Sequence, residues 1–334
     1  MNKILLKQLN DVTKKVNLTI NQIFTRENKP EELYNATKHL IGAGGKRLRP
    51  FLVLKSCEIV GGEMEAALPV AAAIEFIHNF TLIHDDIIDN DDKRRKVQTV
   101  HVLWGTPIAI TAGDMLFAKA YEAVLYNIDF NKISSKRLLR ILDAITKATI
   151  LVCEGQALDI LYEHKVDVSE KEYLNMIGKK TSTLLQLAVK SGAIIGGGRS
   201  SQVKKLDKYA YYAGLVFQIM DDVLGLTGDE KVLGKPIGSD IRKGKRTLIT
   251  IHALAHANNN QRKRILSGLG NKNASLNEIE YIKQTFRSLK SIDYAITKAK
   301  IFQKRAIKHL LSFPPTPTRE VLLKLCEYFI TREY

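Results

Sequence analysis

The apolar positions along the chain follow the spacing of long amphipathic helices. No proline stands between Pro107 and Pro236, and none between Pro236 and Pro314, so long helices can run through both stretches. Within the first stretch, one set of apolar residues recurs at steps of three or four: Leu206, Ala210, Ala213, Phe217, Met220 and Leu224. This is the pattern of a helix with one buried stripe. Because the alternation typical of strands is nearly absent, we predict an all-α protein.

Glycine and proline clusters mark the expected ends of these helices. They lie near residues 30, 42–45, 61–62, 105–107, 196–198, 234–238 and 314–317. The last helix should start at Thr318 as its N-cap and bury Leu322, Cys326, Phe329 and Ile330 on one side. No repeat, low-complexity tract or linker divides the chain. We therefore expect residues 1–334 to form a single domain, a large helical bundle around a central cavity.

Composition and charge narrow the class of protein. With 45% apolar and 26% charged residues, the chain is globular rather than disordered. The net charge of +16 is compatible with a polyanion, an anionic membrane surface or a small phosphorylated substrate. Scattered lysines favour a solvated surface, so we expect no nucleic-acid partner.

The cysteines and the apolar runs predict the compartment. Cys57, Cys153 and Cys326 are widely spaced in apolar surroundings and are expected to be reduced core thiols. The amino terminus has too short an apolar run for a signal peptide. No uncharged stretch reaches the roughly 18 residues of a spanning helix. We therefore predict a cytoplasmic protein without a transmembrane segment, for which only peripheral membrane contact is possible.

The segment HNFTLIHDDIIDNDDKRR, residues 78–95, carries the strongest chemical signal. On a helix with Asp85 at 0°, Asp86 lies at about 100°, Asp89 at about 40° and His78 at about 20°. The surrounding residues are apolar, and carboxylates that emerge from a buried helix are costly unless they bind something. Oxygen ligands at this density suit a hard cation, and magnesium binds through one or two carboxylates plus substrate phosphates.

A second acidic cluster lies in FQIMDDVLGLTGD, where Gln218, Asp221 and Asp222 again follow an apolar stripe. Two such helices could face each other across a cavity and hold magnesium between them. Basic residues that suit a phosphate occur nearby. They are Lys46, Arg47 and Arg49 in GAGGKRLRP, Arg94 and Arg95 after the first cluster, and Lys235 and Lys245 after the second.

Motifs for other chemistries are absent. The chain has no GxSxG elbow, no Walker loop and no HExxH zinc helix. Carboxylate clusters and cations in an apolar helical cavity instead fit a reaction driven by the ionisation of a diphosphate leaving group.

Three motifs, GGKRLRP, DDIID followed by RR, and QIMDD followed by GKP and GK, resemble the trans-isoprenyl diphosphate synthases. The matches span residues 42–247, and the details are most similar to archaeal geranylgeranyl diphosphate synthases. The resemblance implies the all-α isoprenoid-synthase fold, a homodimer, and two to three Mg2+ ions. It also implies condensation of isopentenyl diphosphate with dimethylallyl, geranyl or farnesyl diphosphate by ionisation, condensation and elimination, with geranylgeranyl diphosphate as the product.

The resemblance also implies a role for each site residue. The metal ligands would be Asp85, Asp86, Asp89, Asp221 and Asp222. The allylic diphosphate would be contacted by Arg94, Lys180, Lys235 and Lys245. Isopentenyl diphosphate would be held by Lys46, Arg49, His78 and Arg95. Thr181 and Gln218 would lie near the reacting allylic carbon.

The chain departs from the family pattern at two positions. Gly225 stands where many relatives have a third aspartate, and Asp229 is a possible replacement. Lys96 stands where glycine is common. Phe80, five residues before Asp85 and about 7.5 Å down the helix, resembles the floor of the pocket in twenty-carbon producers.

Several alternatives remain open at this point. The enzyme could make a longer or a shorter product. A terpene cyclase or a squalene-type synthase shares the fold but lacks the GGKRLRP site. A non-catalytic prenyl synthase subunit would typically have lost aspartates of the first motif, and a basic helical nucleic-acid binder would bind DNA in EDTA.

Overall fold

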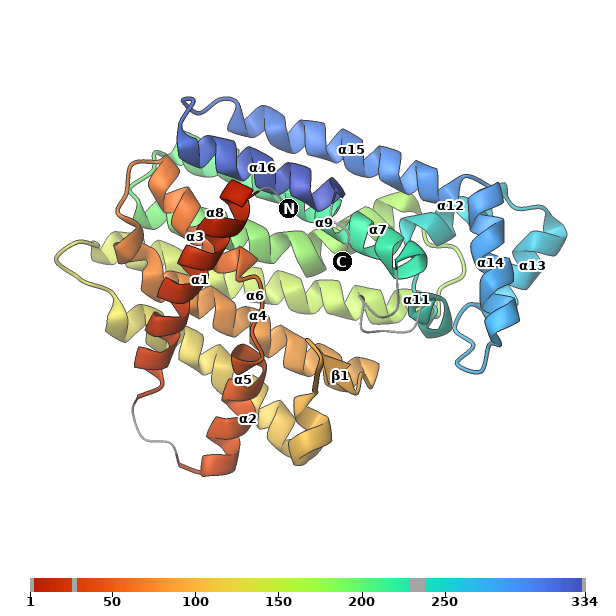
Figure 1. The fold of residues 1–334 in the computed structure, drawn as a ribbon, viewed down its shortest axis with the longest axis horizontal. Coiled ribbons are helices and arrows are strands. Elements are labelled where there is room, and N and C mark those ends of the chain that lie inside the picture. The colour runs from red at the N-terminus through yellow and green to blue at the C-terminus, as the bar shows by residue number, and fades with distance from the viewer. Residues whose placement is uncertain (1–2, 26–28, 229–237, 332–334) are drawn as a thin grey trace. The chain divides into compact units, whose positions relative to one another are not determined.

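The computed structural model of the protein describes residues 3–25, 29–228 and 238–331. Within these ranges the regular secondary structure is helical apart from a single hairpin of β1 (Lys93–Arg94) and β2 (Val97–Gln98). This confirms the predicted all-α class (Figure 1). In chain order the helices are α1 (Lys3–Ile23), α2 (Glu31–Gly42), α3 (Leu48–Ile59), η1 (Met64–Ala67), α4 (Leu68–Asp89), α5 (Val100–Asn127), α6 (Ser135–Glu163), α7 (Glu170–Ile177), η2 (Gly178–Ser182), α8 (Thr183–Ile195), α9 (Ser200–Thr227), α11 (Ser239–Lys243), α12 (Leu248–His256), α13 (Asn259–Gly268), α14 (Leu276–Ser288), α15 (Ser291–Leu310) and α16 (Pro317–Thr331).

The residues group into two compact units. The first contains residues 1–149, 184–207 and 313–322, and the second contains residues 150–183, 208–312 and 323–334. Each unit has its own buried core. The expectation of one domain over residues 1–334 stays a prediction.

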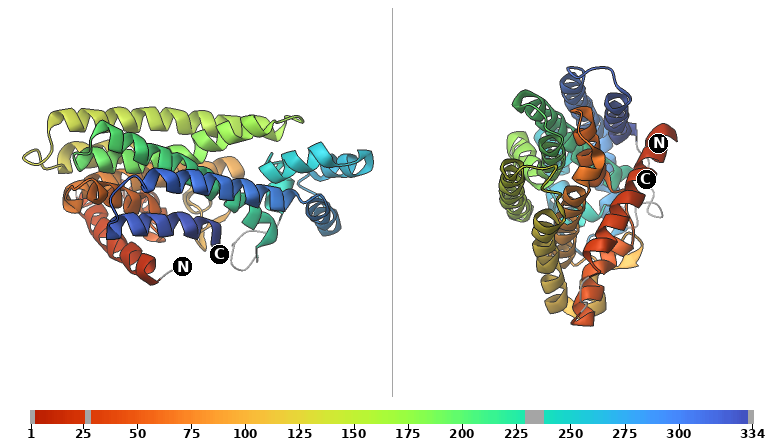
Figure 2. Two further views of the ribbon diagram at one scale, coloured as in Figure 1. Left: turned by 90° about the horizontal axis from the view of Figure 1, so that it is seen from above. Right: turned by 90° about the vertical axis from the view of Figure 1, so that its left-hand side faces the viewer.

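Helix α4 is the centre of the first unit. Residues Pro69–Ile77 are all buried, and α4 packs against α5, α3 and α1, while α2 packs against α5 (Figures 1 and 2). Gly113 allows α5 to approach α4 closely, because a Cβ atom there would lie 2.4 Å from Nε2 of His84. The first acidic cluster therefore sits at the carboxyl end of a rigid, buried helix.

The hairpin after α4 places the two arginines of the first motif. Asn90, in the left-handed conformation, ends α4. Arg95 and Lys96 connect the strands with φ values of 53° and 68°, which is the pattern of a two-residue type I′ turn. A left-handed residue at position 96 favours glycine, which accounts for the glycine that is common there in the family. In this chain Lys96 adopts the same conformation.

In the second unit, the segment η2 is a turn of π-helix between α6 and α9. Both neighbouring helices present a glycine to it. A Cβ atom on Gly155 would lie 2.3 Å from the backbone nitrogen of Lys180, and one on Gly214 would lie 2.5 Å from Cα of Ser182. π-helical turns are frequent at functional sites, and this one carries Lys180 and Thr181.

Local details confirm some predictions and correct others. The predicted break at residues 105–107 is confirmed, because Gly105 has non-helical angles of φ 78° and ψ 158°. The N-cap prediction was wrong: α16 begins at Pro317, and the Thr316 hydroxyl accepts a hydrogen bond from the Arg319 amide (3.2 Å). The proline at 317 fixes this start, since proline is favoured at the first helical position. Cys57 and Cys326 are buried free thiols, but Cys153 is exposed rather than in the core.

In the part of the chain that the structure describes, two helices are long and apolar enough to cross a membrane by length and composition alone. One is the segment Met64–Asp89, which contains α4 and is mostly buried, as expected of a core helix. The other is α5, whose apolar window is 28% buried. Most of this stretch of α5 is therefore not buried within the chain.

Candidate active site

The three aspartates of the first cluster differ in environment. Asp86 is buried, and its Oδ1 accepts a hydrogen bond from Nε of Arg94 at 2.5 Å. Asp85 and Asp89 are half-buried at the end of α4. The sequence offers no reason to distinguish these three aspartates. In the structure, Asp86 is paired with Arg94 of the hairpin, and Asp85 and Asp89 are more accessible to solvent.

Arg49 and His78 contact each other on facing helices. Nη1 of Arg49 lies 3.0 Å from Nε2 of His78. Burial, followed by the charge of Arg49, lowers the pKa of His78 well below its usual value of 6.5. The imidazole is therefore neutral at pH 7, with Nε2 as the acceptor and the proton on Nδ1. Lys46 is exposed on the loop between α2 and α3 that precedes Arg49.

Arg95 reaches from the hairpin to the end of α2. Its Nη1 donates to the carbonyl oxygens of Leu40 (2.7 Å) and Gly44 (2.6 Å). Burial lowers the pKa of this guanidinium, although arginine stays charged at neutral pH. The structure thus brings Lys46, Arg49, His78 and Arg95 into one region of the first unit, around the glycine loop.

In the second unit, a chain of hydrogen bonds links Gln218 and Asp222 of the second cluster to Thr181 and Tyr173. Oγ1 of Thr181 donates to Oε1 of Gln218 (2.7 Å), and Nε2 of Gln218 donates to Oδ1 of Asp222 (2.9 Å). The Tyr173 hydroxyl donates to Oδ2 of the same carboxyl (2.6 Å). Burial, followed by the charge of Asp240, raises the pKa of Asp222 to about 8. Asp221 is half-buried next to it.

Two predicted lysines meet on one buried aspartate. Nζ of Lys180 lies 2.6 Å and Nζ of Lys245 lies 2.8 Å from Oδ2 of Asp159. Lys245 also contacts Oε1 of Glu163 at 2.6 Å. The two ammonium groups lower the pKa of Asp159 against the opposing effect of burial. The pair of lysines is therefore held in place by acidic residues of α6.

Gly225 lies beside a carboxylate that the sequence analysis did not single out. A Cβ atom at residue 225 would be 3.1 Å from Oδ2 of Asp240, which belongs to α11. Asp240 is also close enough to raise the pKa values of both Asp222 and Tyr173. A carboxylate therefore stands next to the position where many relatives carry an aspartate.

Phe80 belongs to a row of aromatic side chains along α4 and α5. Its ring centroid lies 4.8 Å from that of His84 and 5.5 Å from that of Phe117. Phe117 in turn lies 5.3 Å from Tyr121. The aromatic surface below the first cluster therefore comes from two helices and not from Phe80 alone.

Sequence reasoning missed Asp159, Tyr173 and Asp240. A linear motif offers no signal for Asp159, because its lysine partners lie 21 and 86 residues further along the chain. Lys235 and Asp229 lie outside the described residues. The two acidic clusters belong to different units, and their predicted meeting across a cavity stays a prediction.

The carboxylate oxygens of the two acidic clusters suit Mg2+, which needs few protein ligands, better than a metal ion that is coordinated by protein side chains alone. Among residues 3–25, 29–228 and 238–331, no three His, Cys, Asp or Glu side chains converge on one point. Half-buried carboxylates on helix ends supply hard oxygen donors. Mg2+ typically takes one or two such carboxylates and completes its shell with water and substrate phosphates.

Comparison with known proteins agrees with the fold and the motifs. Residues 30–286 match the polyprenyl synthetase family. The short chain isoprenyl diphosphate synthase of Methanocaldococcus jannaschii is 49% identical over 82% of this chain and 81% of its own length. The crystal structure of geranylgeranyl pyrophosphate synthetase from Pyrococcus horikoshii has a TM-score of 0.90 and 41% identity, and the match covers 98% of this chain and 99% of that one. The geranylfarnesyl diphosphate synthase of Aeropyrum pernix is 39% identical over 91% of this chain and 95% of its own length.

These matches define the class of the protein as a prenyltransferase with the isoprenoid-synthase fold. The chain belongs to the polyprenyl synthetase family and is similar to archaeal geranylgeranyl diphosphate synthases. It is a transferase that acts on isoprenyl diphosphates, and enzymes of this family use a divalent metal.

Proposed function

We propose that the protein condenses isopentenyl diphosphate with dimethylallyl, geranyl and farnesyl diphosphate and releases geranylgeranyl diphosphate. The observation that carries the proposal is that each unit holds cations on buried carboxylates: Arg94 on Asp86 of the first cluster in one unit, and Lys180 with Lys245 on Asp159 in the other. Such cations are suited to a diphosphate that must depart from an allylic carbon.

The divalent metal is proposed to be Mg2+, in two to three ions. Asp85, Asp89 and Asp221 are the more accessible carboxylates of the two clusters, and Asp86 and Asp222 complete the ligand set. Bound Mg2+ would neutralise the charge that develops on the leaving diphosphate. Asp240, next to Gly225, would supply the carboxylate that a third aspartate provides in many relatives.

The protein's own cations would divide between the two substrates. Arg94, Lys180, Lys235 and Lys245 would contact the allylic diphosphate. Acidic residues hold Arg94, Lys180 and Lys245 in place and thereby limit the reorganisation that substrate binding requires. Lys46, Arg49, His78 and Arg95 would hold isopentenyl diphosphate around the glycine loop.

Thr181 and Gln218 would stabilise the positive charge on the allylic carbon. The amide of Gln218 is fixed at both ends, by the Thr181 hydroxyl and by the carboxyl of Asp222. An amide dipole that is already oriented does not have to reorient when charge develops. The proton lost on elimination would leave with the released diphosphate, so no protein base is needed.

The product length is proposed to be twenty carbons. Phe80 and Phe117 would close the pocket below the first cluster, because their rings contact each other from α4 and α5. The relative from Aeropyrum pernix is named for geranylfarnesyl diphosphate, a longer product.

The protein is proposed to act as a cytoplasmic homodimer. Helix α5 exposes several large apolar side chains: Val102, Leu103, Ile110, Leu125 and Tyr126. Only 28% of the apolar stretch of α5 is buried within its own chain. Such an exposed apolar helix fits an interface with a second copy of the chain. This surface also supports the alternative of peripheral membrane contact.

One assay tests the proposed function directly. Purified protein is incubated with isopentenyl diphosphate and each allylic diphosphate, with Mg2+ or with EDTA, and the dephosphorylated products are separated by chromatography. We expect Mg2+-dependent elongation that ends at twenty carbons. Asp85→Asn should abolish it, whereas Asp143→Asn, at an exposed aspartate paired with Lys147, should not. Absence of elongation from every starter would refute the proposal.

A further inference from the structure

Arg47 and Glu75 form an ion pair inside the first unit. Nη1 of Arg47 lies 2.8 Å from Oε1 of Glu75, and the side chains are 1% and 2% exposed. In the sequence, Arg47 stands with Lys46 and Arg49 in a group of cations predicted to suit a phosphate. The structure corrects this grouping, because a guanidinium buried to this extent and paired with a carboxylate is not presented to a ligand in solvent.

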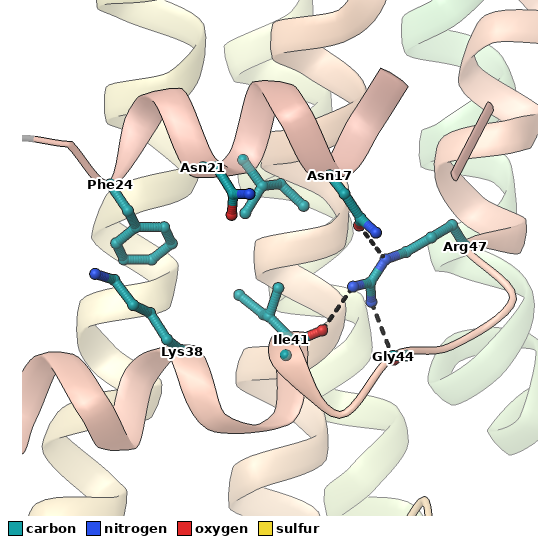
Figure 3. Close-up of a pocket in the computed structure, with 9 residues that line it drawn as sticks. Asn17, Asn21, Phe24, Lys38, Ile41, Gly44 and Arg47 are labelled. Carbon is teal, nitrogen blue, oxygen red and sulfur yellow. Dashed lines mark hydrogen bonds between the residues drawn. The ribbon is translucent and has the colours of Figure 1, made fainter. Parts of the chain in front are cut away.

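The remaining bonds of Arg47 tie together the segments around it. Nε donates to Oδ1 of Asn17 on α1 (3.1 Å). Nη2 donates to the carbonyl of Ile41 (2.7 Å), and Nη1 donates to the carbonyl of Gly44 (3.2 Å). Figure 3 shows Arg47 reaching these three groups at the end of a pocket of about 470 Å3 between α1 and α2. One side chain therefore connects α1, α4 and the carboxyl end of α2.

The same network reaches Arg95. Oε1 of Glu75 also accepts from Nδ2 of Asn79 (3.0 Å), and Oδ1 of Asn79 accepts from Nη1 of Arg95 (3.2 Å). Both guanidinium groups donate to the carbonyl of Gly44. The next residue, Gly45, packs against them, since a Cβ atom there would lie 3.1 Å from Cζ of Arg95.

The backbone at this point is held in an unfavourable conformation. Arg47 has φ 45° and ψ 41°, the left-handed region in which residues with a Cβ atom are disfavoured. Such a conformation persists only when the surroundings determine it. The buried side-chain network of Arg47 supplies that constraint, and Lys46 immediately precedes it in the chain.

We propose that Arg47, Glu75 and Asn79 are positioning residues for the isopentenyl diphosphate site. They would not touch the substrate. They fix the glycine loop that carries Lys46, and they orient Arg95, so that both cations meet the diphosphate without rearrangement. This inference rests on the proposed function, because it assumes that Lys46 and Arg95 bind isopentenyl diphosphate.

The discriminating variant is Arg47→Lys. Lysine keeps the positive charge opposite Glu75, but its single ammonium group cannot reproduce the planar set of bonds to Asn17, Ile41 and Gly44. We expect the KM for isopentenyl diphosphate to rise about tenfold or more, as when binding groups are misplaced by about 1 Å. The KM for geranyl diphosphate should change less than about twofold, which a general loss of structure would not produce.

Three further variants complete the experiment. Glu75→Gln should raise the same KM, because the amide retains an acceptor for Asn79 but removes the charge opposite Arg47. Asn17→Ala removes only the bond to Nε and should cause a smaller rise of about two- to fivefold, which provides a test if the other variants do not fold. Arg137→Lys is the matched control: Arg137 also donates to a backbone carbonyl, that of Ile195 (3.3 Å), and its replacement should leave both KM values unchanged.

The outcomes separate this inference from the proposed function. The positioning role alone is overturned if the wild type elongates and both Arg47→Lys and Asn17→Ala keep the wild-type KM for isopentenyl diphosphate. Equal increases in the KM values of both substrates also overturn it. Wild-type protein that does not elongate refutes the proposed function. In that case, titration calorimetry with isopentenyl diphosphate still measures whether Arg47→Lys weakens its binding.

Discussion

The hydrogen bond from Tyr173 to Asp222 should control how readily the second cluster takes up Mg2+. Asp222 is buried, and its pKa is raised to about 8, so at pH 7 the carboxyl in the ligand-free protein is mostly protonated. The Tyr173 hydroxyl opposes this effect, because its hydrogen bond to Oδ2 (2.6 Å) stabilises the ionised form. Tyr173→Phe removes that bond and leaves the ring in place.

The size of the effect follows from the energy of one hydrogen bond to a charged group. Such a bond contributes about 1.5–3 kcal/mol. At 1.36 kcal/mol per pKa unit, its loss should raise the pKa of Asp222 by about one to two further units. Because Mg2+ competes with the proton for the carboxylate, the apparent affinity for Mg2+ at pH 7 should fall about 10- to 100-fold.

The assay is the Mg2+ dependence of elongation between pH 6.5 and about 9. In the wild type, the concentration of Mg2+ needed for half-maximal rate should fall as the pH rises toward 8 and level off above it. In Tyr173→Phe the same decrease should be displaced to higher pH. Tyr209→Phe, at another fully buried tyrosine of the second unit, is the control for general loss of packing. A Tyr173→Phe enzyme whose Mg2+ requirement matches the wild type at every pH would refute the reasoning.

Three other changes have expected outcomes. Phe80→Ala should give products longer than twenty carbons, read by chromatography, since it removes one ring of the pair with Phe117; an unchanged product ladder would contradict this role. Lys96→Gly should raise the free energy of unfolding by about 0.5–1 kcal/mol, because residue 96 is left-handed (φ 68°); a lower midpoint in urea would contradict it. Asp86→Asn should destabilise the fold by about 1–3 kcal/mol, because it removes the buried charge that accepts a hydrogen bond from Arg94, whereas Asp85→Asn, at a half-buried side chain, should abolish elongation with little change in stability; equal stability of the two variants would argue against this division.

The sequence predicted those features that lie within one helix. The spacing of Asp85, Asp86 and Asp89 defines a common face at the end of α4, because helical geometry fixes the positions of residues three and four apart. The apolar stripe of α9 was predicted for the same reason. Four of its six members are buried, namely Leu206, Ala210, Ala213 and Met220, whereas Phe217 and Leu224 are half-buried. The helical class follows from many such local patterns that agree with one another.

Contacts between distant segments could not be predicted in this way. Arg47 looks equivalent to Lys46 and Arg49 in the sequence, and only packing shows that it points inward. One signal was present: Glu75 stands inside the apolar run VAAAIEFI, and a carboxylate buried there requires a cationic partner. Nothing in the sequence, however, identifies Arg47 as that partner. The meeting of two lysines on Asp159 depends in the same way on tertiary structure.

The π-helical turn between Gly155 and Gly214 has a consequence for how the site can vary. Helices α6 and α9 each meet this turn with a glycine, Gly155 and Gly214. A Cβ atom at either position would collide with the backbone of the turn. Lys180 and Thr181, by contrast, direct their side chains from the turn to Asp159 and Gln218. Mutant libraries that aim to change this enzyme's substrates should therefore keep Gly155 and Gly214 and vary the residues around them. The two glycines set the position of the turn that carries Lys180 and Thr181.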